Sequence, residues 1–204
     1  YDASIQDMVT SKDDWFRPDD VTVAPDGSLF ISDWYDGGVG GHKADDIAQG
    51  RVYHLSTTDG YNPTKFDLTT AEGASKGLLS GNMDVFYQSW NYLHVMGEAA
   101  EPFLQKLIAK GGTAKARALW LGVKIPSKKD NYIQLALTDE NGNYRMQGIR
   151  MAKYVAAENL ENYLASVAND SSAKVRREAA IALKYLGTPK AAEIWTTLAT
   201  YHTA

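Results

Sequence analysis

The feature that most constrains this chain is a helical pattern that recurs along its second half. Three segments share the pattern: residues 86–96, 143–155 and 174–186. Tyr154 and Tyr185 are separated by one period of about 30, and Gly97 and Gly187 by about three such periods. Such a period predicts a solenoid in which each helix pair buries its apolar face against its neighbours. Stacks of this kind usually bind or hold other molecules and seldom carry a reaction centre.

The pattern predicts antiparallel helix pairs over residues 78–204, with about 30 residues in each pair. Gly97 and Gly187 are expected to end helices in the left-handed conformation. The apolar positions predicted to be buried are Leu93, Leu104, Leu119, Ile149, Ile181 and Leu183. The aromatic residues at helical spacing are also expected in the core: Trp90, Tyr92, Trp120, Tyr132, Tyr154, Tyr163, Tyr185 and Trp195.

Arginines recur in phase within the helical half. Their functional interpretation is a ridge that binds an anion or a partner. The regularity of a solenoid favours the alternative, in which they pair between repeats with acidic residues. The arginines are Arg145, Arg150, Arg176 and Arg177, and the acidic candidates are Asp139, Asp170 and Glu178.

The segment 1–60 has the alternation of apolar and polar residues that is typical of strands. Val21–Val23 and Ser28–Asp33 flank a Pro-Asp-Gly turn, and Arg51–Leu55 forms a third strand after a glycine-rich loop. An isolated sheet of this size is marginal in stability and needs cover on its apolar face. Residues 61–77 are turn-rich and predict a linker. The fold class is therefore α+β, mainly α: a small antiparallel sheet over 1–60, a linker over 61–77 and a solenoid over 78–204.

Composition narrows the class of protein. The 204 residues carry a formal net charge of −4, which argues against a general nucleic-acid binder. The chain has no cysteine, so it can form neither a disulfide nor a c-type haem attachment. No apolar run reaches the roughly 18 residues of a membrane span. The chain opens without the features of a signal peptide, and we expect it to be a fragment of a longer protein.

The segment 1–55 resembles part of a known family. The stretch 15–35, then Gly40-Gly41-His42 and residues 50–53, is similar to the last blade of the β-propeller in large bacterial putative membrane-bound dehydrogenases. That propeller is related to sugar dehydrogenases that use pyrroloquinoline quinone. In the family, HEAT-like repeats follow the propeller and precede a cytochrome c domain, and residues 175–183 are the most family-like part of the helical half.

The resemblance implies a fragment of a quinone-dependent sugar or alcohol dehydrogenase-like protein. The chain would supply one wall of a propeller channel and a helical connector, with the other blades and a cytochrome c domain as partners. The implied location is periplasmic or extracellular. Pyrroloquinoline quinone or haem c would belong to the parent protein and no cofactor to this chain, which alone is expected to be non-catalytic.

A blade would bring several polar residues to one edge of the sheet, facing the channel mouth where ligands of such folds sit. The predicted ligand-binding residues are Arg17, Asp19, Asp33, Trp34 and His42. Arg17 would hold carboxylates, and His42 is the candidate base. The plainer interpretation makes Arg17-Pro18-Asp19 a turn with a local salt bridge and Trp34 a packing residue.

The acidic pairs in this region allow a weak calcium hypothesis, but they lack the spacing of a calcium-binding loop, and solvated acidic loops explain them better. No metal site is predicted. The loop from Tyr35 to Gly50 either contributes to the ligand site or packs on the first helices.

Three function classes therefore stay open. The chain could belong to a quinone-dependent dehydrogenase, act as a protein–protein interaction module of HEAT-like repeats, or be a structural fragment without activity. A Cys-x-x-Cys-His motif beyond Ala204 in the parent would favour the first class, and a contiguous apolar or charged patch on the solenoid would favour the second.

Overall fold

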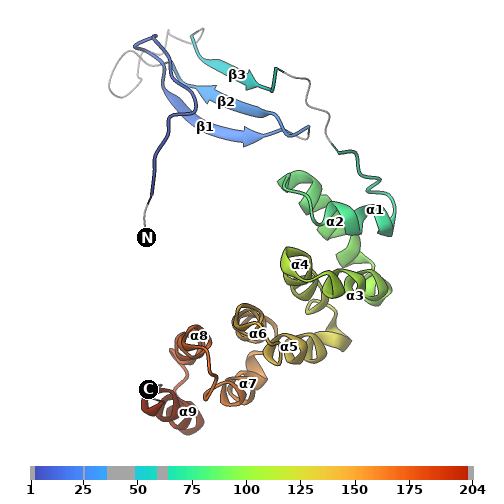
Figure 1. The fold of residues 1–204 in the computed structure, drawn as a ribbon, viewed down its shortest axis with the longest axis vertical. Coiled ribbons are helices and arrows are strands. Elements are labelled where there is room, and N and C mark those ends of the chain that lie inside the picture. The colour runs from blue at the N-terminus through green and yellow to red at the C-terminus, as the bar shows by residue number, and fades with distance from the viewer. Residues whose placement is uncertain (1–2, 25, 36–48, 59–63, 202–204) are drawn as a thin grey trace. The chain divides into compact units, whose positions relative to one another are not determined.

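A computed structural model describes residues 3–24, 26–35, 49–58 and 64–201. Contacts divide the chain into two compact units, one made of residues 1–65 with 82–84 and the other of residues 66–81 with 85–204. The first unit holds a small antiparallel sheet and the second holds the helices (Figure 1). The fold is α+β and mainly α, as the two periodicities predict.

Three antiparallel strands form the sheet of the first unit. They are β1 (Pro18–Val23), β2 (Leu29–Asp33) and β3 (Arg51–Leu55), in the order β1-β2-β3. The turn between β1 and β2 closes through Gly27, whose φ of 87° suits a residue without a Cβ. The Asp26 carboxylate accepts hydrogen bonds from the Ser28 amide at 2.9 Å and the Ser28 hydroxyl at 2.6 Å, which fixes the reversal.

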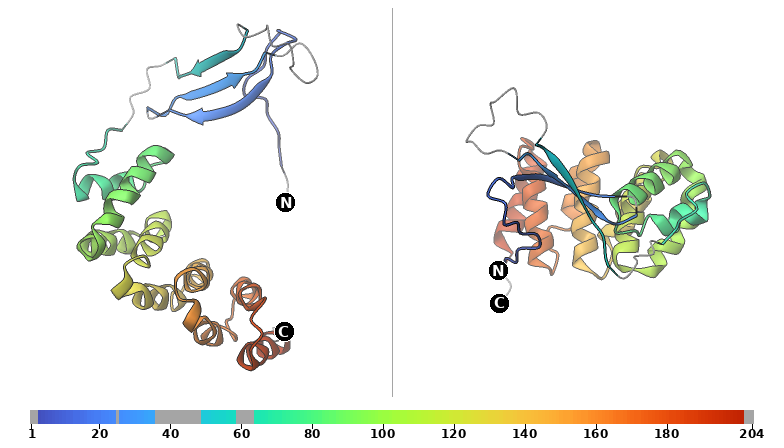
Figure 2. Two further views of the ribbon diagram at one scale, coloured as in Figure 1. Left: turned by 180° about the vertical axis from the view of Figure 1, so that it is seen from behind. Right: turned by 90° about the horizontal axis from the view of Figure 1, so that it is seen from above.

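The second unit is a stack of helices. Its α-helices among the described residues are α1 (Ala71–Gly77), α2 (Met83–Val95), α3 (Glu101–Lys110), α4 (Gly112–Gly122), α5 (Lys129–Leu137), α6 (Gly142–Val155), α7 (Leu160–Ser166), α8 (Ala173–Leu183) and α9 (Pro189–Thr200). Short 3-10 turns precede α3, α5 and α7. Helices α3 with α4, α5 with α6 and α7 with α8 form pairs, and α6 also contacts α8 while α7 contacts α9. Figure 2 shows this succession of pairs from two further sides.

Helix α1 lies where the composition predicts linker. Thr70 caps it by accepting a hydrogen bond from the Gly73 amide at 3.1 Å. A Cβ at Gly73 would lie 1.7 Å from the Asp67 carbonyl oxygen, so glycine is required for the close approach of the preceding chain. The glycines that resemble linker residues in the sequence are thus packing residues here.

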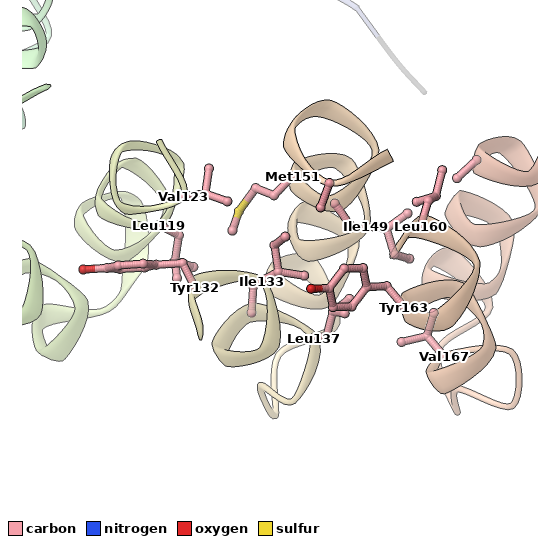
Figure 3. Close-up of a cluster of buried hydrophobic side chains, with 14 of the residues drawn as sticks. Leu119, Val123, Tyr132, Ile133, Leu137, Ile149, Met151, Leu160, Tyr163 and Val167 are labelled. Atoms are coloured by element: carbon pink, nitrogen blue, oxygen red, sulfur yellow. The ribbon is translucent and has the colours of Figure 1, made fainter. Parts of the chain in front are cut away.

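The core runs through the stack without interruption (Figure 3). Tyr132 of α5 lies beside Leu119 of α4 and Val123, the residue after α4, and Tyr163 of α7 lies near Leu137. The predicted burial of Leu93, Leu104, Leu119, Ile149 and Leu183 is confirmed. The prediction for Ile181 is wrong, because this residue is 45% exposed and lines a hollow between α8 and α9.

The expectation that all aromatic residues at helical spacing belong to the core is also partly wrong. Tyr132 and Tyr163 are buried, whereas Tyr154, Tyr185 and Trp195 are exposed. Helical spacing identifies a face of a helix, but only a neighbouring element buries that face.

The chain reversals agree with the sequence at one of the two predicted glycines. Gly97 has a φ of 56°, as predicted for a helix end. Gly187 does not take a positive φ, and Tyr185 takes the left-handed conformation instead, with a φ of 77°. The chain after α8 therefore turns earlier than the glycine suggests, and the Tyr185 ring is exposed there.

Among the helices that the structure describes, none combines the length and the apolar character of a membrane span.

Candidate functional site

Asp33 is the centre of the predicted edge site, and its carboxylate is buried and fully engaged. It accepts hydrogen bonds from the amides of Arg17 at 2.8 Å and Tyr35 at 2.9 Å and from the Tyr53 hydroxyl at 3.3 Å. Burial opposes the charged form, but these donors and the nearby charge of Arg51 outweigh it and lower the pKa of Asp33. Asp33 is thus an ionised group that joins the chain before β1 to β2 and β3.

Arg17 does not aim its guanidinium at Asp33. Its Nη1 donates to the carbonyl oxygens of Asp14 at 2.7 Å and Phe16 at 3.0 Å, so the side chain closes a local turn. The backbone of Arg17 meets Asp33 and also accepts a hydrogen bond from the Trp34 amide at 3.0 Å. The Trp34 ring is exposed. The residues are close in space, but the contacts are mainly those of a structural turn.

Asp19 and His42 complete the predicted set. Asp19 accepts a 2.5 Å hydrogen bond from the Ser32 hydroxyl across the β1–β2 pair. His42 lies outside the described residues, as does most of the loop from Tyr35 to Gly50, so neither prediction for that loop is tested.

The sequence reasoning missed a cation at this edge. Arg51 stacks over the Tyr35 ring at 4.0 Å from its centroid, donates to the Tyr53 hydroxyl at 3.1 Å and pairs with Asp13 at 3.3 Å. The strand register could have identified Arg51 as part of this edge, because Arg51 lies directly opposite Asp33 in the β2–β3 pair.

The side chains at the described part of this edge can be compared with what a metal ion or a quinone would need. Across the described ranges, no group of three or more His, Asp or Glu side chains could hold a metal ion. A quinone that carries carboxylates needs cationic donors free to bind it. Arg17 contacts carbonyls and Arg51 is engaged with Asp13, Tyr35 and Tyr53. These side chains as arranged do not fit the cofactor, and we derive no chemical step through it.

One face of the sheet is apolar and incompletely covered. Cross-strand partners share a face, and the partners Val21–Ile31–Tyr53 lie beside Val23–Leu29–Leu55. Ile31 is buried, whereas Val21 is 58% exposed and Val23 is also exposed. A hollow of about 420 Å³ opens over β1 and β2, and its lining includes Met8, Val9, Phe16, Val21 and Ile31.

The helical unit carries a ladder of charged contacts between repeats. Arg145 binds Asp170 through two hydrogen bonds of 2.6 and 2.8 Å, and Arg150 binds Glu178 through two of 2.9 and 2.8 Å. Lys115 pairs with Asp139 one repeat earlier. The predicted pairing of Arg145 and Arg150 with acidic residues of the next repeat is confirmed.

The ladder changes character at Arg176. This residue follows Arg145 by one repeat period and likewise donates to two carbonyls that precede its helix, those of Asp170 and Ser171. Its guanidinium stacks over the Tyr201 ring at 4.0 Å. The last contact of this series among the described residues is therefore a cation–π contact.

Comparison with known families assigns one match to each half. Residues 1–59 match a domain family of unknown function (DUF7133), and residues 130–201 match HEAT repeats. No curated protein matches the chain. Residues 130–201 are thus similar to HEAT repeats, a class that holds or binds other molecules through stacked helix pairs.

Proposed function

We propose that this chain supplies one blade of a β-propeller and a helical connector to a quinone-dependent sugar or alcohol dehydrogenase-like protein. In this proposal the other blades cover the sheet, and the HEAT-like repeats hold an electron-accepting partner such as a cytochrome c domain. The assembly would lie in the periplasm or outside the cell, as the resemblance implies. The quinone, or a calcium ion beside it, would be bound mainly by residues of other blades.

The observation that carries the proposal is the exposed apolar face of the sheet. Val21 and Val23 stand among six apolar side chains on this face, yet both remain exposed. A propeller blade has four strands and packs face to face on its neighbours, whereas three strands are present among the described residues. The uncovered face and the strand number both suit a blade whose neighbours lie elsewhere.

The Asp33 network supports the same proposal. Its hydrogen bonds to Arg17, Tyr35 and Tyr53 tie three segments together at one end of the sheet. In a closed propeller such an edge would border the channel, where a fixed wall presents the exposed Trp34 and Asp19 to a ligand. His42 stays the candidate base of the parent site.

The test is reconstitution with the other blades of the proposed propeller. We expect the chain alone to show no quinone-dependent oxidation of sugars or alcohols with a dye acceptor, and the mixture to show it. Val21→Lys should block assembly in sedimentation, because a buried, unpaired ammonium opposes docking. Tyr87→Lys, at an exposed position of α2, is the matched control. Turnover by the chain alone that disappears on Arg17→Ala, or normal assembly of Val21→Lys, would contradict the proposal.

A specific observation also favours the second candidate function, a protein–protein interaction module without catalysis. The last described helices, α8 and α9, expose an apolar groove. The two functions are separable, since the sheet face and the groove belong to different units.

A further inference from the structure

The end of the helical stack exposes a surface with the character of an interior repeat interface. A groove of about 780 Å³ lies between α8 and α9. Apolar side chains dominate its lining, among them Ile181, Leu186 and Trp195, and Arg177 and Lys184 stand at its rim. A contiguous apolar surface of this kind indicates a site that is covered in use.

The repeat register identifies what such a surface receives. Ile133 of α5, Leu164 of α7 and Trp195 of α9 follow one another at the constant spacing of the repeat. Ile133 and Leu164 are completely buried, whereas Trp195 is 54% exposed. Trp195 therefore occupies a core position of the repeat that lacks its cover among the described residues.

The second helices of the pairs, α4, α6 and α8, also indicate a repeat position that lacks its cover among the described residues. Trp120 of α4 packs edge-on against Tyr154 of α6 at 6.3 Å, and Arg150 of α6 binds Glu178 of α8. Ile181 of α8 follows Arg150 at the same repeat spacing. Helix α4 contacts α6 and α6 contacts α8 in this row, and Ile181 is exposed and apolar where a further second helix would lie.

We propose that the groove between α8 and α9 binds an acidic amphipathic helix of a partner protein, which enters in the position of a further second helix. The groove continues the α4–α6–α8 row, so its shape is that of an interface already used inside the stack. The Ile181 and Trp195 side chains would pack against the apolar stripe of the partner helix. Arg177 and Lys184 favour carboxylates on its flank. This inference goes beyond the proposed role of the sheet and does not depend on it.

The chain itself provides a probe of the right geometry. Helix α8 fills the corresponding position one repeat earlier, where it contacts both α6 and α7. A labelled peptide of residues 172–186 with glutamate in place of Lys174, Arg177 and Lys184 keeps the apolar stripe and becomes acidic. The unmodified peptide, which is basic, is the charge control, and a scrambled acidic peptide is the control for the stripe.

Binding is measured by fluorescence anisotropy on the full chain. We expect the acidic peptide to bind at least about tenfold more tightly than either control, since steering and stripe both contribute. Ile181→Glu should weaken binding about tenfold or more and leave the circular dichroism spectrum unchanged, because Ile181 is exposed. Val95→Glu, at an exposed position of α2, should have no effect. Arg177→Glu should remove most of the preference for the acidic over the basic peptide, because Lys184 then stands against one carboxylate.

Several outcomes would overturn the inference. Equal binding of the acidic and scrambled peptides would show that the groove does not recognise a helix. Normal binding by Ile181→Glu would place the peptide elsewhere. Self-association of the chain that Ile181→Glu abolishes would assign the groove to a second copy. Hydrogen-exchange protection of α8 and α9 in a longer natural form without partner would assign it to the same polypeptide.

Discussion

The strongest test of the repeat architecture is removal of the Asp170 carboxylate. Asp170 accepts both hydrogen bonds from Arg145 and a third from the Ser172 amide at 2.7 Å. Its side chain is 7% exposed and that of Arg145 is 14% exposed. Arg145 also donates to the carbonyls of Asp139 at 2.7 Å and Glu140 at 2.9 Å, so one guanidinium connects the turn before α6 with the turn before α8.

The expected cost follows from this burial. Breaking a buried ion pair by removing one partner costs about 3–5 kcal/mol. Because Arg145 keeps its two carbonyl acceptors, we place Asp170→Ala near the lower end, at about 3 kcal/mol. Asp170→Asn keeps an oxygen for the Ser172 amide and loses the charge, so we expect about 2 kcal/mol.

The matched control has the same chemistry at a more exposed site. Arg150 also forms two hydrogen bonds with a carboxylate of the next repeat, but its side chain is 55% exposed. Solvent screens such a pair, and Arg150→Ala should cost about 1 kcal/mol or less. The two variants therefore compare an ion pair that is buried on both sides with one whose arginine is exposed.

The assay is urea unfolding followed by circular dichroism, with hydrogen exchange to locate the loss. Repeat stacks can lose cooperativity, so exchange in α7 and α8 should increase before exchange in α3 and α4. If Asp170→Ala and Arg150→Ala destabilise the chain equally, burial does not determine the strength of the ladder and the reasoning is refuted.

The effect of pH on Asp170 has a defined sign. Burial raises the pKa of this carboxyl, but the hydrogen bonds from Arg145 and Ser172 and the charges of Arg145 and Arg176 outweigh burial and lower it. A lowered pKa in the folded state stabilises the fold above the unfolded value of about 3.9, and this is lost as pH falls through the folded pKa. The difference between the native chain and Asp170→Asn should accordingly shrink in acid.

Three further predictions concern packing and titration. Gly122→Ala should cost about 1–3 kcal/mol in urea unfolding, because its Cβ would lie 2.2 Å from the Tyr132 ring, while Gly81→Ala, with open space around it, should be near neutral. Leu183→Asp should unfold the last repeats in hydrogen exchange, whereas Ile181→Asp should change stability by about 0.5 kcal/mol or less, and equal effects would contradict their assigned burial. Burial raises the pKa of Tyr132 to about 12, so its stabilising effect is complete below the unfolded value of about 10 and is lost as pH rises through 12; absorbance titration should show one late-titrating tyrosine fewer in Tyr132→Phe.

The stack was predictable because its signals are local and repeated. Period and helical spacing place Leu93, Leu104, Leu119 and Ile149 on one face, and a stack buries that face in every inner repeat. The same regularity predicted that the arginines pair with acidic residues between repeats, although it did not assign Arg145 to Asp170. Strand alternation likewise predicted the three-stranded sheet, since alternation and the Asp-Gly turn act between near neighbours in the chain.

The rest depends on neighbours that a sequence pattern does not show. Ile181 and Trp195 have the spacing of core residues, but exposure is decided by whether another helix follows. Tyr185 adopts a left-handed φ because the chain must reverse there, although the nearby Gly187 is the better local candidate. Arg17 was predicted to hold carboxylates with its guanidinium, whereas that group donates to backbone carbonyls and the backbone amide of Arg17 contacts Asp33. The types of the side chains predicted that Arg17 and Asp33 lie close together, but not that a backbone amide would form the hydrogen bond between them.

The two uncovered apolar faces differ in the charge around them, and this difference can direct two partners to two sites. The hollow over the sheet is bordered by Asp19 and Asp20, whereas the groove between α8 and α9 is bordered by Arg177 and Lys184. An acidic helix that fits the groove would meet like charges at the sheet, which disfavours the wrong complex as well as stabilising the right one. The acidic peptide should therefore bind the Val21→Lys variant with unchanged affinity, and the Ile181→Glu variant should still assemble with the other blades. A loss of peptide binding in Val21→Lys would show that the sheet face, and not the groove, receives the helix.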